Sequence, residues 1–226
     1  MHLCDVDPAA LEECRADLPA ARSSLVDLAD SSALERWLSG VTTELGGLDV
    51  LVNNAGIKGP TAFVEDVSLA DWRSCLAIGL DAQFLCSRAV VPIMKRQGSG
   101  RIINISSTAG LFGVGMRTPY AAAKWAVVGL TKSLAIELGP YGVTCNCVCP
   151  GSVQGERIDR VIDAEAALRG VDAETVRAEY LQVQSVRRFV EPTEVAALCL
   201  YLASPAAAML TGQALAIDGN TETFHL

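Results

Sequence analysis

The segment Tyr120-Ala-Ala-Ala-Lys124 places a phenol and an ammonium group four residues apart. On a helix these two side chains share one face and lie one turn apart. The positive charge of the lysine favours the phenolate and lowers the pKa of the tyrosine, so the phenol becomes usable as an acid or base. The spacing also occurs by chance in many helices. It therefore indicates a reactive pair only if other polar groups gather at the same place.

Several loops that follow apolar, strand-like runs carry polar residues or glycines. Ser107 follows the run 101–105. Three further runs are followed by Asn53-Asn54-Ala55-Gly56, by Pro150-Gly151 and by Asp218-Gly219. The carboxyl ends of parallel strands meet at one edge of a sheet, where doubly wound folds bind their ligands. These loops therefore predict one shared site.

Short apolar runs alternate along the chain with longer amphipathic segments. Most of the short runs are continuously apolar, which is typical of strands covered on both faces. The pattern predicts an α/β fold, a Rossmann-like doubly wound parallel sheet with helices on both faces, as a single domain over residues 1–226. The expected strands are 3–4, 24–26, 49–52, 101–105, 144–148 and 214–217, and the expected helices are 8–17, 31–45, 69–96, 119–139, 158–183 and 192–203.

Composition excludes several classes of protein. Half of the 226 residues are hydrophobic, and 18 Lys and Arg face 26 Asp and Glu, for a net charge of −8. Such a chain can form a core, and its negative charge disfavours nucleic acid and anionic membranes as partners. No apolar stretch approaches the roughly 18 residues of a membrane span, and the N-terminus does not resemble a signal peptide. A soluble cytoplasmic protein is expected.

Eight cysteines are present, and none forms a C-x-x-C pair. Cys145, Cys147 and Cys149 alternate, so on a strand they share one face. A metal site would need nearby histidines or a second cysteine cluster, and the two histidines in the chain are His2 and His225. We expect no metal and interpret these thiols as reduced, small hydrophobic side chains.

Together these motifs resemble the short-chain dehydrogenase/reductase family, and the resemblance extends from residue 1 to about residue 220. It implies a nicotinamide cofactor and hydride transfer between that cofactor and an alcohol or carbonyl substrate. By resemblance, Tyr120 is the proton donor or acceptor at the substrate oxygen. Lys124 lowers the pKa of Tyr120 and holds the nicotinamide ribose, and Ser107 hydrogen-bonds the substrate carbonyl.

The resemblance also implies the cofactor contacts. Asp5 falls where an acidic residue closes the second strand of the family fold, which favours NAD over NADP because a carboxylate repels a 2′-phosphate. The alternative is a surface aspartate in a turn. The other expected contacts are Asp27 and Leu28 at the adenine, Asn53, Ala55 and Gly56 on the adenosine side, and Pro150, Gly151 and Val153 at the nicotinamide. For Leu28 and Val153 the alternative is core packing.

Two single positions depart from the family pattern. Seven residues after Trp72, where the family has a catalytic Asn, this chain has Gly79. That Asn would hold a water linking the lysine to solvent, so proton relay is expected to be impaired or taken over by another group. Gly155 stands where the family often has a Thr that contacts the nicotinamide carboxamide.

The third departure is larger. No G-x-x-x-G-x-G turn precedes the first expected strand, so the phosphate-binding loop and the central strand of the family fold are missing. Without that strand, the backbone groups of its neighbours lack partners. The chain is expected to rearrange, to borrow a strand, or to be a shortened record of a longer protein, which is the favoured option.

The leading functional hypothesis is an NAD-dependent oxidoreductase acting on an alcohol or ketone. The alternative is a non-catalytic or cofactor-deficient remnant that acts as an oligomeric or binding protein. A sugar-nucleotide epimerase or dehydratase is a third, disfavoured option. Residues 155–190 are expected to form a variable substrate lid, in which Arg157 would meet a substrate carboxylate or hydroxyl, or else belong to a solvated helix face. A homodimer or homotetramer through helices near 69–96 and 119–139 is expected.

Overall fold

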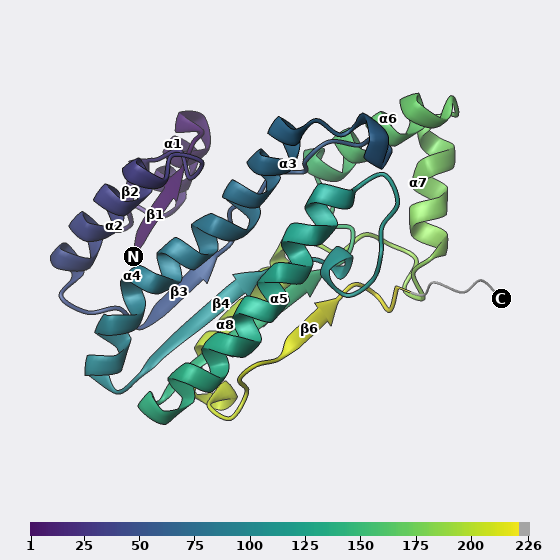
Figure 1. Cartoon of the computed structure of the whole chain (residues 1–226). Coiled ribbons are helices and arrows are strands. Elements are labelled where there is room, and N and C mark those ends of the chain that lie inside the picture. The colour runs from purple at the N-terminus through teal and green to yellow at the C-terminus, as the bar shows by residue number, and fades with distance from the viewer. Residues whose placement is uncertain (222–226) are drawn as a thin grey trace.

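The computed structural model describes residues 1–221 and confirms the α/β architecture (Figure 1). The strands are β1 (His2–Asp5), β2 (Arg22–Leu25), β3 (Val50–Asn53), β4 (Gly100–Ile105), β5 (Val143–Pro150) and β6 (Ala214–Ile217). The longer helices are α1 (Pro8–Asp17), α2 (Ser31–Leu45), α3 (Leu69–Leu76), α4 (Ala82–Gln97), α5 (Thr118–Leu138), α6 (Glu156–Arg169), α7 (Ala173–Gln182) and α8 (Pro192–Ala203).

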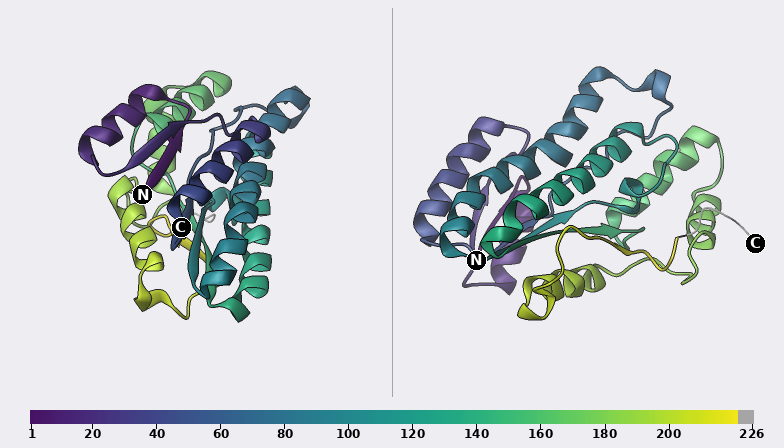
Figure 2. Two further views of the ribbon diagram at one scale, coloured as in Figure 1. Left: turned by 90° about the vertical axis from the view of Figure 1, so that its left-hand side faces the viewer. Right: turned by 60° about the horizontal axis from the view of Figure 1, so that its bottom comes forward.

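The main sheet has the parallel order β3-β4-β5-β6. One face is covered by α4 and α5, whose Met94 and Leu138 pack on Ile102 of β4. The other face is covered by α8, whose Leu202 packs on Ile103. The two helical layers lie on opposite sides of the sheet (Figures 1 and 2). Burial on both faces explains why the central strands are continuously apolar.

The N-terminal strands form a separate parallel pair, with β1 beside β2. Among the described strands β1 pairs only with β2 and β3 only with β4, so each keeps one edge without a strand partner. The pair stands beside the main sheet (Figure 2). It is joined to the rest through α2, whose Leu34 and Leu38 pack on Ala82 and Cys86 of α4. The described chain is divided into two sheets and does not rearrange to join them.

Two expected helices differ from those observed. The segment 158–183 forms two helices, because Gly170 ends α6 in the left-handed region (φ +67°) and Asp172 caps α7. The segment 69–96 is interrupted by a π turn at Ala77–Asp81, between α3 and α4. Such turns are frequent near functional sites.

The stretch Leu69–Gln97 is long and apolar enough to cross a membrane by length and composition. The expectation that no stretch approaches that length was therefore wrong. In the fold this stretch is a core helix, since Val90 and Met94 are buried between β4 and α5. Apolar residues needed for packing on a sheet and on two helices give it the same composition as a span.

The alternating cysteines of β5 are buried on the face covered by α5. Cys145 joins the cluster around Leu138, and Cys147 and Cys149 pack with Val127 and Val128. They act as small hydrophobic side chains. The second histidine, His225, lies outside the described residues.

Candidate active site

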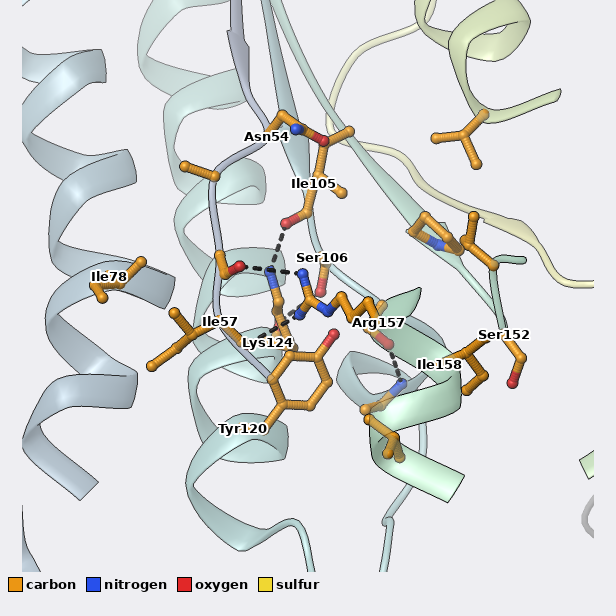
Figure 3. A pocket seen from close by; sticks show the side chains of 18 of the residues that line it. Asn54, Ile57, Ile78, Ile105, Ser106, Tyr120, Lys124, Ser152, Arg157 and Ile158 are labelled. Atoms are coloured by element: carbon orange, nitrogen blue, oxygen red, sulfur yellow. Dashed lines mark hydrogen bonds between the residues drawn. The ribbon is translucent and has the colours of Figure 1, made fainter. Parts of the chain in front are cut away.

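One cavity of about 570 Å³ runs along the carboxyl ends of both sheets. It begins beside β1 and β2, passes the loop after β3, and ends between α5 and α6. Figure 3 shows the end of the cavity at which Tyr120, Lys124 and Arg157 lie. Eleven of the twelve predicted site residues line it: Asp5, Asp27, Leu28, Ala55, Gly56, Ser107, Tyr120, Lys124, Pro150, Gly151 and Val153. Residues from six separate loops and helices are thus brought to one place.

Asn53 is the exception. Its side chain is buried away from the cavity, where Nδ2 donates to Asn104 Oδ1 at 2.8 Å and to Ser87 Oγ at 3.3 Å. Asn54 lines the cavity instead. The side chain of Asn53 therefore does not line the cavity, and its expected contact with the adenosine stays a prediction. Successive residues at a strand end point to opposite faces, so the adjacent asparagine faces the ligand side.

Lys124 is held in place from several sides. The side chain is 3% exposed, and Nζ donates to the carbonyl oxygen of Ile105 at 2.9 Å. The backbone carbonyl of Lys124 accepts from Ser106 Oγ at 2.8 Å. A Cβ at Gly110 would lie 2.6 Å from that same carbonyl oxygen, so only glycine allows this close approach. These contacts fix the first turns of α5 against the end of β4.

Tyr120 lies one turn before Lys124 and titrates below its ordinary range. Burial raises the pKa of the phenol, but the charges of Lys124, Arg157 and Arg117 and a hydrogen-bond contribution from Ser107 lower it further, so the net shift is downward. The phenolate is therefore stabilised inside the cavity. This is the shift that an acid/base tyrosine needs to work near neutral pH.

Burial and the neighbouring Arg157 lower the pKa of Lys124 by more than Tyr120 raises it, so the net shift is downward.

Ser107 begins a short 3-10 turn, Thr108–Gly110, and its Oγ accepts from the Ala109 amide at 3.1 Å. This hydrogen bond aims the hydroxyl from the end of β4 into the cavity that Tyr120 also lines. Ser107, Tyr120 and Lys124 thus form one connected group of polar side chains.

Two arginines belong to the same end of the cavity. The guanidinium carbon of Arg117 lies 4.8 Å from the Tyr120 ring centroid, and that of Arg157 lies 5.8 Å from it. Figure 3 shows Arg157 reaching over Tyr120 towards Lys124. Sequence reasoning placed Arg157 near the site but missed Arg117. The one available signal was its position three residues before the tyrosine.

Gln83 was also missed. Its Nε2 donates to the carbonyl oxygen of Ile105 at 3.2 Å, the same acceptor that Lys124 uses. Its Oε1 is buried and has no hydrogen-bond partner among the described residues. Gln83 lies one turn after Gly79, which is buried in the π turn with its Cα facing Ala123. The turn carries no local sequence signal that would single out Gln83.

Gly155 occupies a backbone conformation that explains its identity. Its φ is +135°, and it is the residue before the first turn of α6. A threonine there would be strained, since side chains other than glycine rarely adopt this region. Arg157, two residues further on, lies in the first turn of α6 and lines the cavity.

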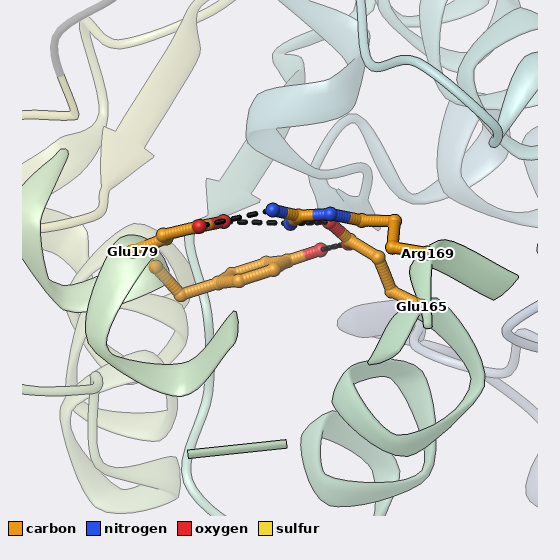
Figure 4. Close-up of polar contacts among 4 residues, drawn as sticks. Glu165, Arg169 and Glu179 are labelled. Atoms are coloured by element: carbon orange, nitrogen blue, oxygen red, sulfur yellow. Dashed lines mark hydrogen bonds and ion pairs between the residues drawn. The ribbon is translucent and has the colours of Figure 1, made fainter. Parts of the chain in front are cut away.

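The helices α6 and α7 both contribute residues to the cavity lining. Charged side chains tie the two helices together (Figure 4). Arg169 donates to Glu165 at 2.9 Å and to both oxygens of Glu179 at 2.6 and 2.9 Å. Tyr180, which lines the cavity, donates to Glu165 at 3.0 Å. This network holds α6 and α7 in a defined arrangement over the site.

Comparison with known proteins shows which proteins this chain resembles. A family model described as enoyl-(acyl carrier protein) reductase matches residues 1–220. The D-beta-hydroxybutyrate dehydrogenase of Rhizobium meliloti (strain 1021) is 38% identical over 194 residues, 85% of this chain and 75% of that protein. The trans-4-hydroxycyclohexanecarboxylate dehydrogenase of Sinomonas cyclohexanicum is 42% identical over 194 residues, 84% of this chain and 68% of that protein.

The crystal structure of NAD⁺-bound xylitol dehydrogenase superposes with a TM-score of 0.90 at 28% identity, and the match covers 96% of this chain and 86% of that one. The family match, the identity to curated relatives and the shared fold agree with one another. The chain belongs to the short-chain dehydrogenase/reductase family.

Proposed function

We propose that this chain is an NAD-dependent oxidoreductase that interconverts an alcohol and the corresponding ketone, with Tyr120 as the acid/base group. The observation that carries the proposal is the electrostatic setting of Tyr120. It lies in the cavity beside Lys124 and Ser107, and its pKa is lowered despite burial because positive charges surround it. A tyrosine of this kind exchanges a proton with a substrate oxygen near neutral pH.

The donor set of the cavity fits the two ends of a nicotinamide dinucleotide. Asp5 and Asp27 line one end, where carboxylates accept hydrogen bonds from ribose hydroxyls and repel a 2′-phosphate. Lys124 and Tyr120 line the other end, beside Pro150, Gly151 and Val153. None of the described lining residues beside β1 is a glycine or a cation, so this part of the cavity offers no phosphate cradle.

A nicotinamide supplies the acceptor or donor of the hydride when it is bound. In alcohol oxidation, Tyr120 as phenolate accepts the hydroxyl proton, and Ser107 holds the substrate oxygen beside it. Lys124 keeps the phenolate charge stabilised through its ammonium, which the carbonyl of Ile105 fixes in position. In the reverse direction the phenol returns the proton to the ketone oxygen.

The helices α6 and α7 serve in this proposal as the substrate lid, spanning most of residues 155–190. Phe84, Trp125 and Ile136 expose apolar surface on α4 and α5, and it supports a homodimer or homotetramer through these helices. Multi-angle light scattering at micromolar concentration tests the oligomer. A monomer would contradict it.

Assays of the whole chain test the function. The names of two relatives specify secondary alcohols with a carboxylate, D-3-hydroxybutyrate and trans-4-hydroxycyclohexanecarboxylate. We propose these two compounds, with 2-butanol and cyclohexanol, as the first substrates, with NAD⁺ at millimolar concentration and NADH formation as the readout. Tyr120→Phe should abolish the rate. Absence of NADH with all four alcohols, in a folded sample that binds NAD⁺, would favour the non-catalytic alternative.

A further inference from the structure

The substrate end of the cavity carries an excess of positive charge. Arg117, Lys124 and Arg157 surround Tyr120, with guanidinium carbons or Nζ at 4.8, 5.7 and 5.8 Å from its ring centroid. The carboxylates that line the cavity, Asp5 and Asp27, lie at its other end. The cavity is therefore polarised along its length.

The two arginines have no ionic partner within the described residues. Three other arginines of the chain, Arg169, Arg177 and Arg188, each form an ion pair with an aspartate or glutamate. Arg117 and Arg157 form none among residues 1–221 and donate to backbone carbonyls instead. Arg117 is 8% exposed, and its Nε is buried without a partner in that part of the chain. Arg157 is exposed by comparison. For Arg117, a buried guanidinium without a counter-ion is costly, and a bound anion would remove that cost.

One short loop holds both guanidinium groups. Arg117 donates to the carbonyl of Lys58 at 2.5 Å, and Arg157 donates to the carbonyls of Gly56 and Ile57 at 3.1 and 2.9 Å. Three consecutive carbonyls thus orient two arginines that are 40 positions apart in the sequence. Side chains held in this way lose little further freedom when they bind a ligand.

We propose that Arg117 and Arg157 form an anion subsite for a carboxylate on the substrate itself, so that the substrate is a hydroxy acid or the matching oxo acid. This inference rests on the proposed function. The arginine fork suits a carboxylate, because its N–H groups match two oxygens at once. The subsite adjoins Tyr120, so the reacting hydroxyl and the carboxylate are only a few carbons apart. The carboxylate takes no part in the bond changes.

A matched pair of substrates tests the subsite. D-3-hydroxybutyrate and trans-4-hydroxycyclohexanecarboxylate are each compared with their methyl esters, which keep the hydroxyl and remove the charge. The chain should prefer each acid over its ester in kcat/KM. Arg157→Ala should lower kcat/KM for the acids by about 10- to 100-fold, the range expected for hydrogen bonds to a charged group, mainly through KM. Loss of the Arg157 charge also raises the pKa of Tyr120, but that loss of rate is shared by acids and esters. The acid-to-ester ratio of kcat/KM should therefore fall about 10- to 100-fold, whereas a general structural defect would leave that ratio unchanged.

Arg160→Ala is the matched control, because Arg160 lies on the same helix, is exposed, pairs with Glu156 and does not line the cavity. It should change neither substrate class. Arg117→Lys tests the other arginine of the subsite, because it keeps the charge and removes the guanidinium. Thermal melting shows whether this variant is folded. Equal use of acid and ester by the parent chain, or equal losses for both in Arg157→Ala, would overturn the inference and leave the proposed function standing.

A binding experiment covers the case in which no alcohol is oxidised. Calorimetric titration with butyrate and cyclohexanecarboxylate, against butyramide and cyclohexanecarboxamide, should show that only the acids bind and that Arg157→Ala weakens them. Carboxylate binding without turnover would support the subsite and count against the proposed function. No carboxylate binding would overturn the subsite. If Arg157→Ala loses affinity for NAD⁺ but keeps the preference for acids, the arginines bind the cofactor. That result would also overturn the carboxylate subsite.

Discussion

Gln83 and Lys124 donate hydrogen bonds to the same acceptor, the carbonyl oxygen of Ile105, at 3.2 and 2.9 Å. One side chain comes from α4 and the other from α5, and both are buried. The ammonium that stabilises the Tyr120 phenolate is therefore aligned by a carbonyl that a second helix also holds. The family places an Asn near this lysine, and here the corresponding residue is Gly79.

The first prediction concerns Gln83 as a positioning residue. Gln83→Met keeps the volume of the side chain and removes its donor, so the Ile105 carbonyl and Lys124 Nζ lose a constraint. We expect kcat to fall about fivefold, the value of one net hydrogen bond, with KM unchanged. The rising limb of the pH profile for oxidation should also move to higher pH, which loss of stability alone would not cause. An unaltered kcat and profile would contradict this role.

Gly79→Asn is the second prediction. A Cβ at Gly79 would lie 3.2 Å from the Cβ of Ala123, so the new side chain must push into α5. Overpacking of this kind costs about 1–3 kcal/mol, more than the few tenths gained in helix propensity. We expect a lower melting temperature, measured calorimetrically, with partial recovery in the Gly79→Asn, Ala123→Gly double variant.

If the family's Asn-held water supports turnover here, the double variant of Gly79 and Ala123 should raise kcat without changing KM. The same two substitutions can be added to Gln83→Met. A gain in kcat there would show that the asparagine replaces Gln83 in positioning Lys124. Unchanged kcat in every background would show that the proton passes through another group.

The third prediction is a shift of pH dependence in Arg157→Gln. The charge of Arg157 lowers the pKa of Tyr120, so removing it raises that pKa. Oxidation needs the phenolate, and its rate therefore rises with pH through the pKa of Tyr120. The rising limb of kcat against pH for a neutral alcohol should move to higher pH, whereas Arg160→Gln should leave it in place. A rising limb at the same pH as in the parent chain would mean that the pKa of Tyr120 does not determine where kcat rises.

The fourth prediction concerns the cofactor. Asp5 lines the cavity beside β1, and its charge should favour NAD⁺ over NADP⁺. Fluorescence titration of NADH and NADPH should show this preference, and Asp5→Ala should reduce it. For this chain, affinity for both should be weak, since the described lining beside β1 supplies no phosphate-binding amides. Micromolar binding of NADH, or equal affinity for both dinucleotides in the parent chain, would contradict the respective part of the prediction.

Local sequence was sufficient for most elements of this fold. The predicted bounds of α1, α2, α8 and β6 agree with those observed, because capping residues and apolar periodicity act over a few residues. Helix 158–183 was predicted as one element, although Gly170 breaks it with a positive φ. A single glycine within an amphipathic pattern does not by itself reveal which backbone region it adopts.

The pairing of Tyr120 with Lys124, and the gathering of strand-end loops around them, were determined by the sequence alone. Helical spacing and the meeting of parallel strand ends act regardless of the rest of the chain. Only the tertiary structure decided that Asn53 turns into the core, that Gln83 shares a carbonyl with Lys124, and that Arg117 and Arg157 meet on one loop. These contacts join residues from about 20 to 100 positions apart, and no local periodicity encodes the packing that brings them together.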